Sequence, residues 1–189
     1  AQRQGLKNVF VSNGYMSSDA AAALVRVLDG INIDIKAFSE EFYRSICGGS
    51  LQQVLDNVRY FRDRGVWVEA TTLVIPELND SEEELQRLAA FICSVDPALP
   101  WHVSAFRPTY KMTDRLPTPS QVLNRARDIG HAAGLRHVYI GNVHGGGGED
   151  TGCPACAKTV IHRHGFTVRE NLLAQGSCPF CNTALSGVW

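Results

Sequence analysis

Two Cys-x-x-Cys pairs near the end of the chain carry the clearest chemistry in this sequence. The first pair is Cys153 and Cys156, and the second is Cys178 and Cys181, with 21 residues between the pairs. Two residues between paired cysteines allow both thiolates to bind one ion, and two such pairs complete a tetrahedral site. We therefore predict a closed, structural metal site that holds zinc or, as the second choice, iron. Two redox-active dithiols are the alternative, although neither pair opens a helix after a strand.

The segment that holds these cysteines, residues 153–189, is predicted to be a small zinc-ribbon or rubredoxin-like module. So short a segment cannot fold on core burial alone, and metal binding would supply the missing free energy. His162 and His164 lie between the two pairs. They are alternative ligands, but four thiolates already suffice, so we expect solvated or packing histidines. Cys47 and Cys93 lie alone elsewhere, and we expect them to pack.

A second group of polar residues lies on one strand-like run. Asn32, Asp34 and Lys36 alternate with Ile33 and Ile35. An extended backbone therefore places the three polar side chains on one face. Parallel strands buried on both faces usually have continuous apolar sequences. The pattern indicates a polar barrel interior or mouth, where barrel enzymes hold their chemistry. A structural Asp–Lys pair explains it equally well.

Other polar faces are weaker signals. Glu69 and Thr71 share a face of one later run, and His102 and Ser104 share a face of the next. Residues 13–14 (Asn-Gly) end the first run in the same polar way, which a plain turn would also explain.

The elements that must position these residues alternate along the chain. Strand-like runs fall at about 8–12, 31–35, 66–75, 101–106 and 137–141, and helical apolar spacing occurs within 51–61, 85–92 and 122–129. Such alternation implies parallel strands with right-handed crossovers. An open doubly wound sheet and a barrel both satisfy it. Because five runs are fewer than an eight-stranded barrel needs, we predict an α/β fold with a partial barrel that lacks its N-terminal strands.

Helix boundaries are marked by caps and glycines. Capping boxes are predicted at Ser50 with Gln53, Ser81 with Glu84, and Thr118 with Gln121, the last with Pro119 at the first helical position. A glycine separates a helical segment from a strand-like run at positions 65 and 134, and again at position 5. Only four residues precede Gly5, so we expect the chain to be a fragment that begins inside a helix.

The glycine run 145–148 predicts a flexible linker over residues 143–152. This linker would separate a βα domain, residues 1–142, from the cysteine module, residues 153–189. The run does not open a helix after a strand, so it is not a phosphate-binding fingerprint.

Composition restricts the remaining classes of function. The 189 residues carry a formal net charge of -1 and are 44% hydrophobic, with no apolar run that could span a membrane. Such a charge is not the footprint of a nucleic-acid-binding protein. The pairing of four cysteines suits metal ligation in a reducing compartment, so we expect a cytoplasmic protein.

Seven segments, in order, resemble the AmmeMemoRadiSam-system radical SAM enzymes, which are similar to pyruvate formate-lyase activating enzymes. The segments are 9–15 (VFVSNGY), 32–36 (NIDIK), 72–76 (TLVIP), 79–80 (ND), 101–104 (WHVS), 110–114 (YKMTD) and 139–142 (YIGN). The closing cysteine module belongs to the same resemblance, which covers nearly the whole chain.

The resemblance implies a partial (βα)6 radical SAM barrel that binds a [4Fe-4S] cluster and S-adenosylmethionine. In such enzymes the cluster reductively cleaves S-adenosylmethionine to a 5′-deoxyadenosyl radical. This radical would abstract hydrogen from a substrate, and a protein glycine is one such substrate. The resemblance assigns cofactor contacts to Asp34, Ile35 and Lys36, and less securely to Ser12 and Asn13. A carboxylate and an ammonium suit this zwitterionic ligand. Implied partners are a protein substrate, AmmeMemo-type proteins and an electron donor such as flavodoxin or ferredoxin.

The sequence departs from this family in two places. The cluster motif Cys-x-x-x-Cys-x-x-Cys and its following glycine-rich stretch do not occur in the chain, so we expect the chain alone to be inactive. Phe106 and Arg107 stand where activating enzymes carry a cofactor-contacting histidine, and Ala105 replaces a larger residue.

Two other classes of function are weighed against the enzyme. A zinc-ribbon module that binds a protein partner or nucleic acid is the alternative, although residues 150–189 contain only three basic and two acidic residues. A complete α/β enzyme with another cofactor is the third hypothesis.

Overall fold

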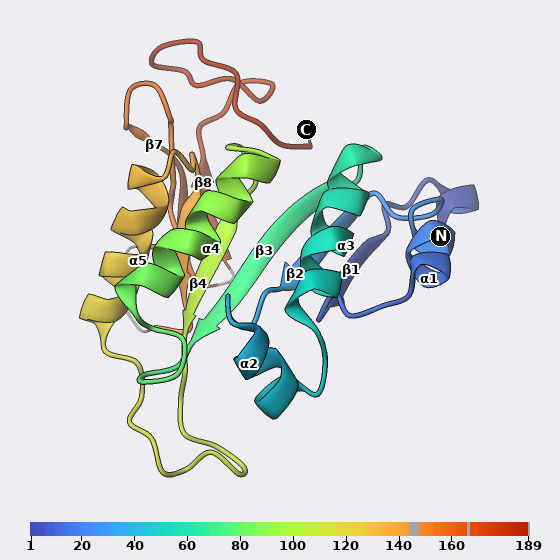
Figure 1. Ribbon diagram of the computed structural model, residues 1–189. Helices are drawn as coiled ribbons and strands as arrows, with labels where there is room; N and C mark the ends of the chain where they lie inside the picture. Colours follow the sequence, from blue (N-terminus) through green and yellow to red (C-terminus); the bar gives the residue numbers. More distant parts are fainter. Residues whose placement is uncertain (144–147, 166, 189) are drawn as a thin grey trace.

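A computed structural model describes residues 1–143, 148–165 and 167–188 of the chain. Five strands form one parallel sheet in the order β1-β2-β3-β4-β5, and three further strands form an antiparallel sheet in the order β6-β7-β8 (Figure 1). The predicted α/β class with parallel strands is therefore confirmed.

The parallel sheet consists of short strands joined by helical crossovers. Its strands are β1 (Val9–Ser12), β2 (Gly30–Asp34), β3 (Trp67–Val74), β4 (Trp101–Ala105) and β5 (Val138–Gly141). Its helices are α1 (Ser18–Leu24), α2 (Glu40–Phe42), α3 (Leu51–Asp63), α4 (Glu82–Val95) and α5 (Ser120–Ala132). A 3-10 turn, Gln2–Gln4, precedes β1, and a π-helical turn, Tyr43–Cys47, follows α2. Among the described residues, no helix is long and apolar enough to cross a membrane.

The helices cover one face of this sheet, and the core lies beneath them (Figure 1). Ile31 and Ile33 of β2 and Trp101 of β4 are at most 1% exposed. Burying an aliphatic side chain of this size contributes about 1.5–3 kcal/mol each. Gly130 lets α5 approach closely, because a Cβ there would lie 2.8 Å from the Val138 side chain.

Side chains on the other face of the sheet are half-buried and mostly polar. The burial pattern of β3 alternates residue by residue, with Glu69 and Thr71 on the less buried face and Ala70 and Thr72 on the buried face. β4 alternates in the same way, with His102 on the less buried face. The predicted assignment of these residues to faces is confirmed.

The predicted capping boxes are wrong in detail. Ser81 caps α4 by accepting a hydrogen bond from the Glu84 backbone N–H, 3.3 Å. The Glu84 carboxylate does not return to Ser81, because it accepts the distant Phe38 N–H at 2.6 Å. Burial of Glu84 there raises the pKa of its carboxyl.

The other two boxes fail for the same reason. Ser50 makes no side-chain cap, and the Leu51 N–H instead donates to Glu40. Thr118 lies before the helix, where its hydroxyl donates to the Val74 carbonyl and accepts from the Phe106 N–H, 2.8 Å. Distant partners take the Thr118 hydroxyl and also the Gln53 side chain, which donates to the Met16 carbonyl. Pro119, predicted at the first helical position, is instead the N-cap of α5.

The second sheet consists of β6 (Thr151–Gly152), β7 (Thr159–His164) and β8 (Thr167–Asn171). Most of the predicted glycine run, residues 145–147, lies outside the described residues. Thr151 and Gly152, within the predicted linker, pair with β7. The division of the chain into residues 1–142, 143–152 and 153–189 stays a prediction.

Burial in this core makes a direct test of the sheet possible. Ile33 is fully buried, whereas Ile46 is 46% exposed. Ile33→Ala should lower the free energy of unfolding by about 2–5 kcal/mol, because it leaves a cavity between β2 and the helices. The matched Ile46→Ala should change it by less than about 0.5 kcal/mol. Urea unfolding followed by circular dichroism checks this, and equal losses for both variants would contradict the described packing.

Candidate functional site

The four cysteines of the two pairs converge on one point. Their sulfur atoms all lie within 4.8 Å of one another, and the six cysteines of the chain are all free thiols. Cys153 and Cys178 are buried, and Cys181 lies at the surface. The predicted four-cysteine metal-binding group is confirmed, and its sulfur donors suit zinc or iron.

The two pairs are held by the same backbone turn. In the first, the Ala157 N–H donates to the Cys153 carbonyl, and in the second the Asn182 N–H donates to the Cys178 carbonyl, each at 2.9 Å. Ala157 and Asn182 both adopt a left-handed backbone, with φ of 58° and 64°. Equivalent turns aim both thiols of each pair at a common centre, as a metal knuckle requires.

The thiols of this group differ in acidity. A hydrogen bond with the Thr183 hydroxyl is the main reason that the pKa of Cys181 falls to about 6. The Lys158 N–H favours the Cys156 thiolate, but desolvation and hydrogen bonds with the other cysteines outweigh it and raise the pKa of Cys156 to about 11. A bound metal ion would hold all four as thiolates, because ligation displaces their protons.

The histidines between the pairs take no part in this group. Nδ1 of His162 lies 3.4 Å from a carboxylate oxygen of Asp150, and its Nε2 lies 3.9 Å from Glu170. The metal-binding group of the described chain contains cysteines alone. The prediction that four thiolates suffice agrees with this arrangement.

The polar residues predicted at the end of β2 form a second candidate site. Nζ of Lys36 donates to Oδ2 of Asp34 at 2.6 Å, and the two side chains are 37% and 28% exposed. The Lys36 backbone N–H donates to the buried Tyr43 hydroxyl, and burial raises the pKa of Tyr43 to about 12. Ile35 is fully buried. Asp34 and Lys36 are therefore fixed in place yet open to a ligand.

Ser12 and Asn13 lie beside this pair, because Ser12 is in register with Ile33 of β2. The Ser12 hydroxyl accepts the Gly14 N–H at 3.1 Å, and the Asn13 side chain accepts the Tyr15 N–H at 3.0 Å. Gly14 has a φ of 70°, and a Cβ there would lie 2.6 Å from Ile33. The tight turn that was the alternative for residues 13–14 is present.

Asn79 organises the site, and the residue pattern did not reveal that role. Its side chain is 2% exposed. It donates to the carbonyls of Lys36 (2.7 Å) and Leu73 (2.9 Å) and accepts the Ile75 N–H (2.6 Å). It ties the end of β2 to the end of β3. The available signal was an asparagine five residues after the last residue of β3.

A third polar group lines the open face of the sheet. Glu69 accepts hydrogen bonds from His102 (2.8 Å) and Trp67 (3.0 Å), and the His102 ring stacks on Tyr139 at 5.2 Å. Burial alone would raise the pKa of Glu69, but these hydrogen bonds bring it below its ordinary value. The group lines a cavity of about 990 Å³ between the sheet and the cysteine module.

The cysteine group and the Asp34–Lys36 site lie at opposite ends of the strands of the sheet. The cysteine module adjoins the beginning of β5, since His137 and Cys153 line one cavity. Asp34, Lys36 and Asn79 lie at the carboxyl ends of β2 and β3, near α2, at the far end of the sheet from the red C-terminal segment (Figure 1). The four cysteines therefore do not contribute to the Asp34–Lys36 site.

Comparison with known proteins relates the N-terminal part of the chain to a known superfamily. Residues 1–89 match the model of the radical SAM superfamily. A crystal structure of a domain of pyruvate-formate lyase-activating enzyme from Bacteroides vulgatus superposes with a TM-score of 0.63, at 18% identity, over 75% of this chain and 84% of that chain. The likeness to this crystal structure shows a shared fold.

Two relatives extend this result. The uncharacterized protein MJ0808 of Methanocaldococcus jannaschii is 38% identical over 170 residues, which are 89% of this chain and 50% of that protein. Pyruvate formate-lyase 1-activating enzyme of Escherichia coli K12 is 21% identical over 141 residues, 68% of this chain and 57% of the enzyme. The chain thus spans about half the length of these relatives. It contains radical SAM domain sequence and is homologous to glycyl-radical activating enzymes.

The metal centre leads to a test on the chain itself. The purified chain should contain about one zinc or iron ion, and Cys153→Ser should lose it, because three thiolates leave the tetrahedral site incomplete. Loss of metal should expose residues 153–188 to protease, since metal binding and folding are coupled. The matched Cys47→Ser should retain the metal. Elemental analysis measures the metal content, and limited proteolysis measures the folding of the module. A folded, metal-free module would contradict the prediction.

Proposed function

We propose that this chain is the C-terminal part of a radical SAM enzyme of the AmmeMemoRadiSam type, in which Asp34 and Lys36 contact S-adenosylmethionine. The five-stranded sheet would be the rear portion of a partial (βα)6 barrel. The cysteine module would be a structural zinc ribbon or rubredoxin-like unit. Ile35 would hold the strand in the core, and Ser12 and Asn13 would border the cofactor.

The observation that carries this proposal is the Asp34–Lys36 pair at the carboxyl end of a parallel strand. In βα barrels this edge is where chemistry takes place. The two side chains offer an accessible carboxylate and an accessible ammonium, held side by side at 2.6 Å. The ligand carries an ammonium, a carboxylate and a sulfonium, so its charges complement this pair. The residues present therefore fit the amino-acid end of S-adenosylmethionine.

The edge strand β1 supports a longer barrel. Val9, Phe10 and Val11 are 69%, 43% and 77% exposed. Exposed apolar edge strands are uncommon, because they invite pairing with another strand. Together with the coverage of about half of each relative, this favours upstream strands that pair with β1 in the full-length protein.

The residues of this chain do not fit the iron–sulfur cluster of that chemistry. The motif Cys-x-x-x-Cys-x-x-Cys does not occur in the chain. The four cysteines form a closed set at the opposite edge of the sheet, with no open ligand position. The chain alone is therefore proposed to be inactive.

In the full-length protein, a cluster held by residues outside this chain would, with S-adenosylmethionine, supply the 5′-deoxyadenosyl radical chemistry of hydrogen abstraction. The proposed substrate is a protein, with glycyl-radical activation as the reaction, and the proposed partners are AmmeMemo-type proteins and a flavodoxin or ferredoxin donor in the cytoplasm. Within this chain, Asp34 and Lys36 would bind and orient the amino-acid end of the ligand. Asn79 would hold the Lys36 backbone in place.

The alternative is a non-catalytic zinc ribbon that binds a protein partner or nucleic acid. The small excess of basic residues in residues 150–189 makes nucleic acid the weaker choice, since counterion release requires many phosphate contacts. The upstream coding sequence distinguishes between these two functions. An upstream Cys-x-x-x-Cys-x-x-Cys motif supports the enzyme, and its absence from the gene favours the binding module.

The cofactor assignment is tested in the full-length protein. Asp34→Ala should weaken S-adenosylmethionine binding by about tenfold or more, because it removes a charged hydrogen-bond acceptor. The cluster spectrum should stay unchanged. Asp56→Ala, on the exposed side of α3, should bind like the wild type. Equilibrium binding measures the affinity for S-adenosylmethionine, and electron paramagnetic resonance measures the cluster spectrum. Unchanged affinity in Asp34→Ala would refute the assignment.

A further inference from the structure

The polar face of the sheet, opposite the helices, is overlain by the C-terminal part of the chain. A cavity of about 990 Å³ lies between the sheet and this part, and Glu69 and His102 line it on the sheet side. Residues of the segments 149–165 and 185–188 line it on the other side. These two segments therefore form a cover over the Glu69–His102 pair.

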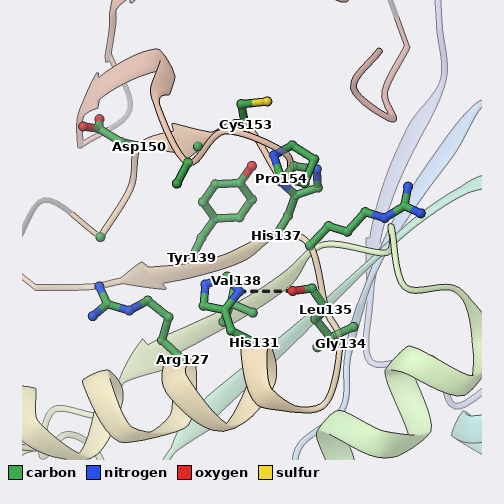
Figure 2. Close-up of a pocket in the computed structure, with 14 residues that line it drawn as sticks. Arg127, His131, Gly134, Leu135, His137, Val138, Tyr139, Asp150, Cys153 and Pro154 are labelled. Carbon is green, nitrogen blue, oxygen red and sulfur yellow. Dashed lines mark hydrogen bonds between the residues drawn. The ribbon is translucent and has the colours of Figure 1, made fainter. Parts of the chain in front are cut away.

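Tyr139 of β5 bonds this cover to the sheet. Figure 2 shows its ring on the side of β5 that faces Pro154, opposite Arg127 of α5. The Tyr139 hydroxyl shares a hydrogen bond of 2.9 Å with the Thr151 hydroxyl. The Arg163 guanidinium lies 5.6 Å from the centre of the Tyr139 ring, within the range of a cation–π attraction. One side chain of the sheet thus meets two residues of the cover.

Arg163 also holds the cover in shape at this contact. Its Nη1 donates to the Thr151 hydroxyl at 2.6 Å and to the Glu149 carbonyl at 2.9 Å. Within the part of the chain that the structure describes, Arg163 forms no ion pair. Its positive charge is therefore directed at Thr151, the Glu149 carbonyl and the Tyr139 ring.

The cover and the sheet have separate apolar cores. The cluster around Val160 and Cys178 shares no residue with the core of the sheet. Tyr139 contacts the cover through polar groups, and the Ile140 N–H donates to the Gly148 carbonyl, just before the cover, at 2.9 Å. A few hydrogen bonds contribute far less than a buried core. The cover can therefore open while the sheet stays folded.

The four-cysteine group holds both contact residues of the cover in place. Thr151 lies two residues before Cys153 and pairs with Ile161 of β7. Arg163 lies on the same strand, β7, between the two cysteine pairs in sequence. Metal binding and folding are coupled in so small a module. Loss of the metal would therefore release Thr151 and Arg163 together.

We propose that the cysteine module forms a metal-dependent cover of the polar face of the sheet, anchored on Tyr139 by Thr151 and Arg163. With metal bound, the cover lies over the Glu69–His102 pair. Without metal, the sheet stays folded and the pair becomes accessible, so the metal shifts a two-state equilibrium. The cover does not depend on the proposed radical chemistry. In the proposed enzyme it would also keep bulk water from the barrel interior, and that consequence rests on the proposed function.

Hydrogen exchange of the intact chain, with its metal and after removal of the metal by EDTA, tests the cover. Mass spectrometry should show segment 138–141 exchanging about tenfold faster without metal, because opening frees the Ile140 N–H. Diethyl pyrocarbonate should modify His102 faster as well. Segment 51–63 (α3), in the core of the sheet, should stay within about twofold. Unchanged exchange in 138–141, or equal acceleration in 51–63, would overturn the proposal.

The anchor is tested in the metal-loaded chain. Arg163→Gln should raise exchange in segment 138–141 by about tenfold and Tyr139→Phe by about threefold, since the first loses charged hydrogen bonds and the second a neutral one. Elemental analysis should show that both variants retain the metal. Arg169→Gln is the matched control, because it lies on the exposed strand β8 of the same module, and its exchange should match the wild type.

Two outcomes would overturn the anchor. Loss of metal in Arg163→Gln would show that Arg163 acts in folding the module instead of docking it. Unchanged exchange in Tyr139→Phe, whose substitution lies outside the module, would show that Tyr139 does not hold the cover. Neither measurement uses S-adenosylmethionine, so a failure of the radical SAM assignment would be seen separately, in the binding test of Asp34→Ala.

Discussion

The parallel direction of all five strands is the constraint on which the rest of the structure depends. Parallel pairing requires a crossover between strands, and each crossover returns the chain to the same starting edge. All strand carboxyl ends therefore meet at one edge, where Asp34, Lys36 and Asn79 lie. All strand amino ends meet at the other end of the sheet, and the first cysteine pair lies near the start of β5. The strand direction therefore separates the Asp34–Lys36 pair from the four cysteines.

The cysteine module is joined to the sheet through polar contacts. Arg163 of β7 donates to the Thr151 hydroxyl at 2.6 Å, and Thr151 shares a hydrogen bond with the Tyr139 hydroxyl at 2.9 Å. Tyr139 stacks on His102, which bonds to Glu69 of β3. The apolar cluster of the module, around Val160 and Cys178, is separate from the core of the sheet. Its position therefore depends on this hydrogen-bonded path as well as on apolar burial.

Features encoded by local spacing were predictable, and features that need long-range register were not. The strands and the cysteine group followed from periodicity and from Cys-x-x-Cys spacing. The contact between Glu69 and His102 needs the pairing of Thr71 with His102 across β3 and β4, which no local pattern specifies. The same holds for Glu84 and Asn79, whose partners lie 46 and 43 residues away.

The Asp34–Lys36 pair also restricts what can bind there. Its two charges cancel, so a ligand of one sign would gain from one side chain and lose against the other. A ligand with both an ammonium and a carboxylate can exchange partners with the pair, meeting each charge with its opposite. The pair is about one third exposed, and breaking an ion pair at this level of exposure costs about 0–1 kcal/mol. A ligand that carries both charges therefore suits this position better than a simple cation or anion would.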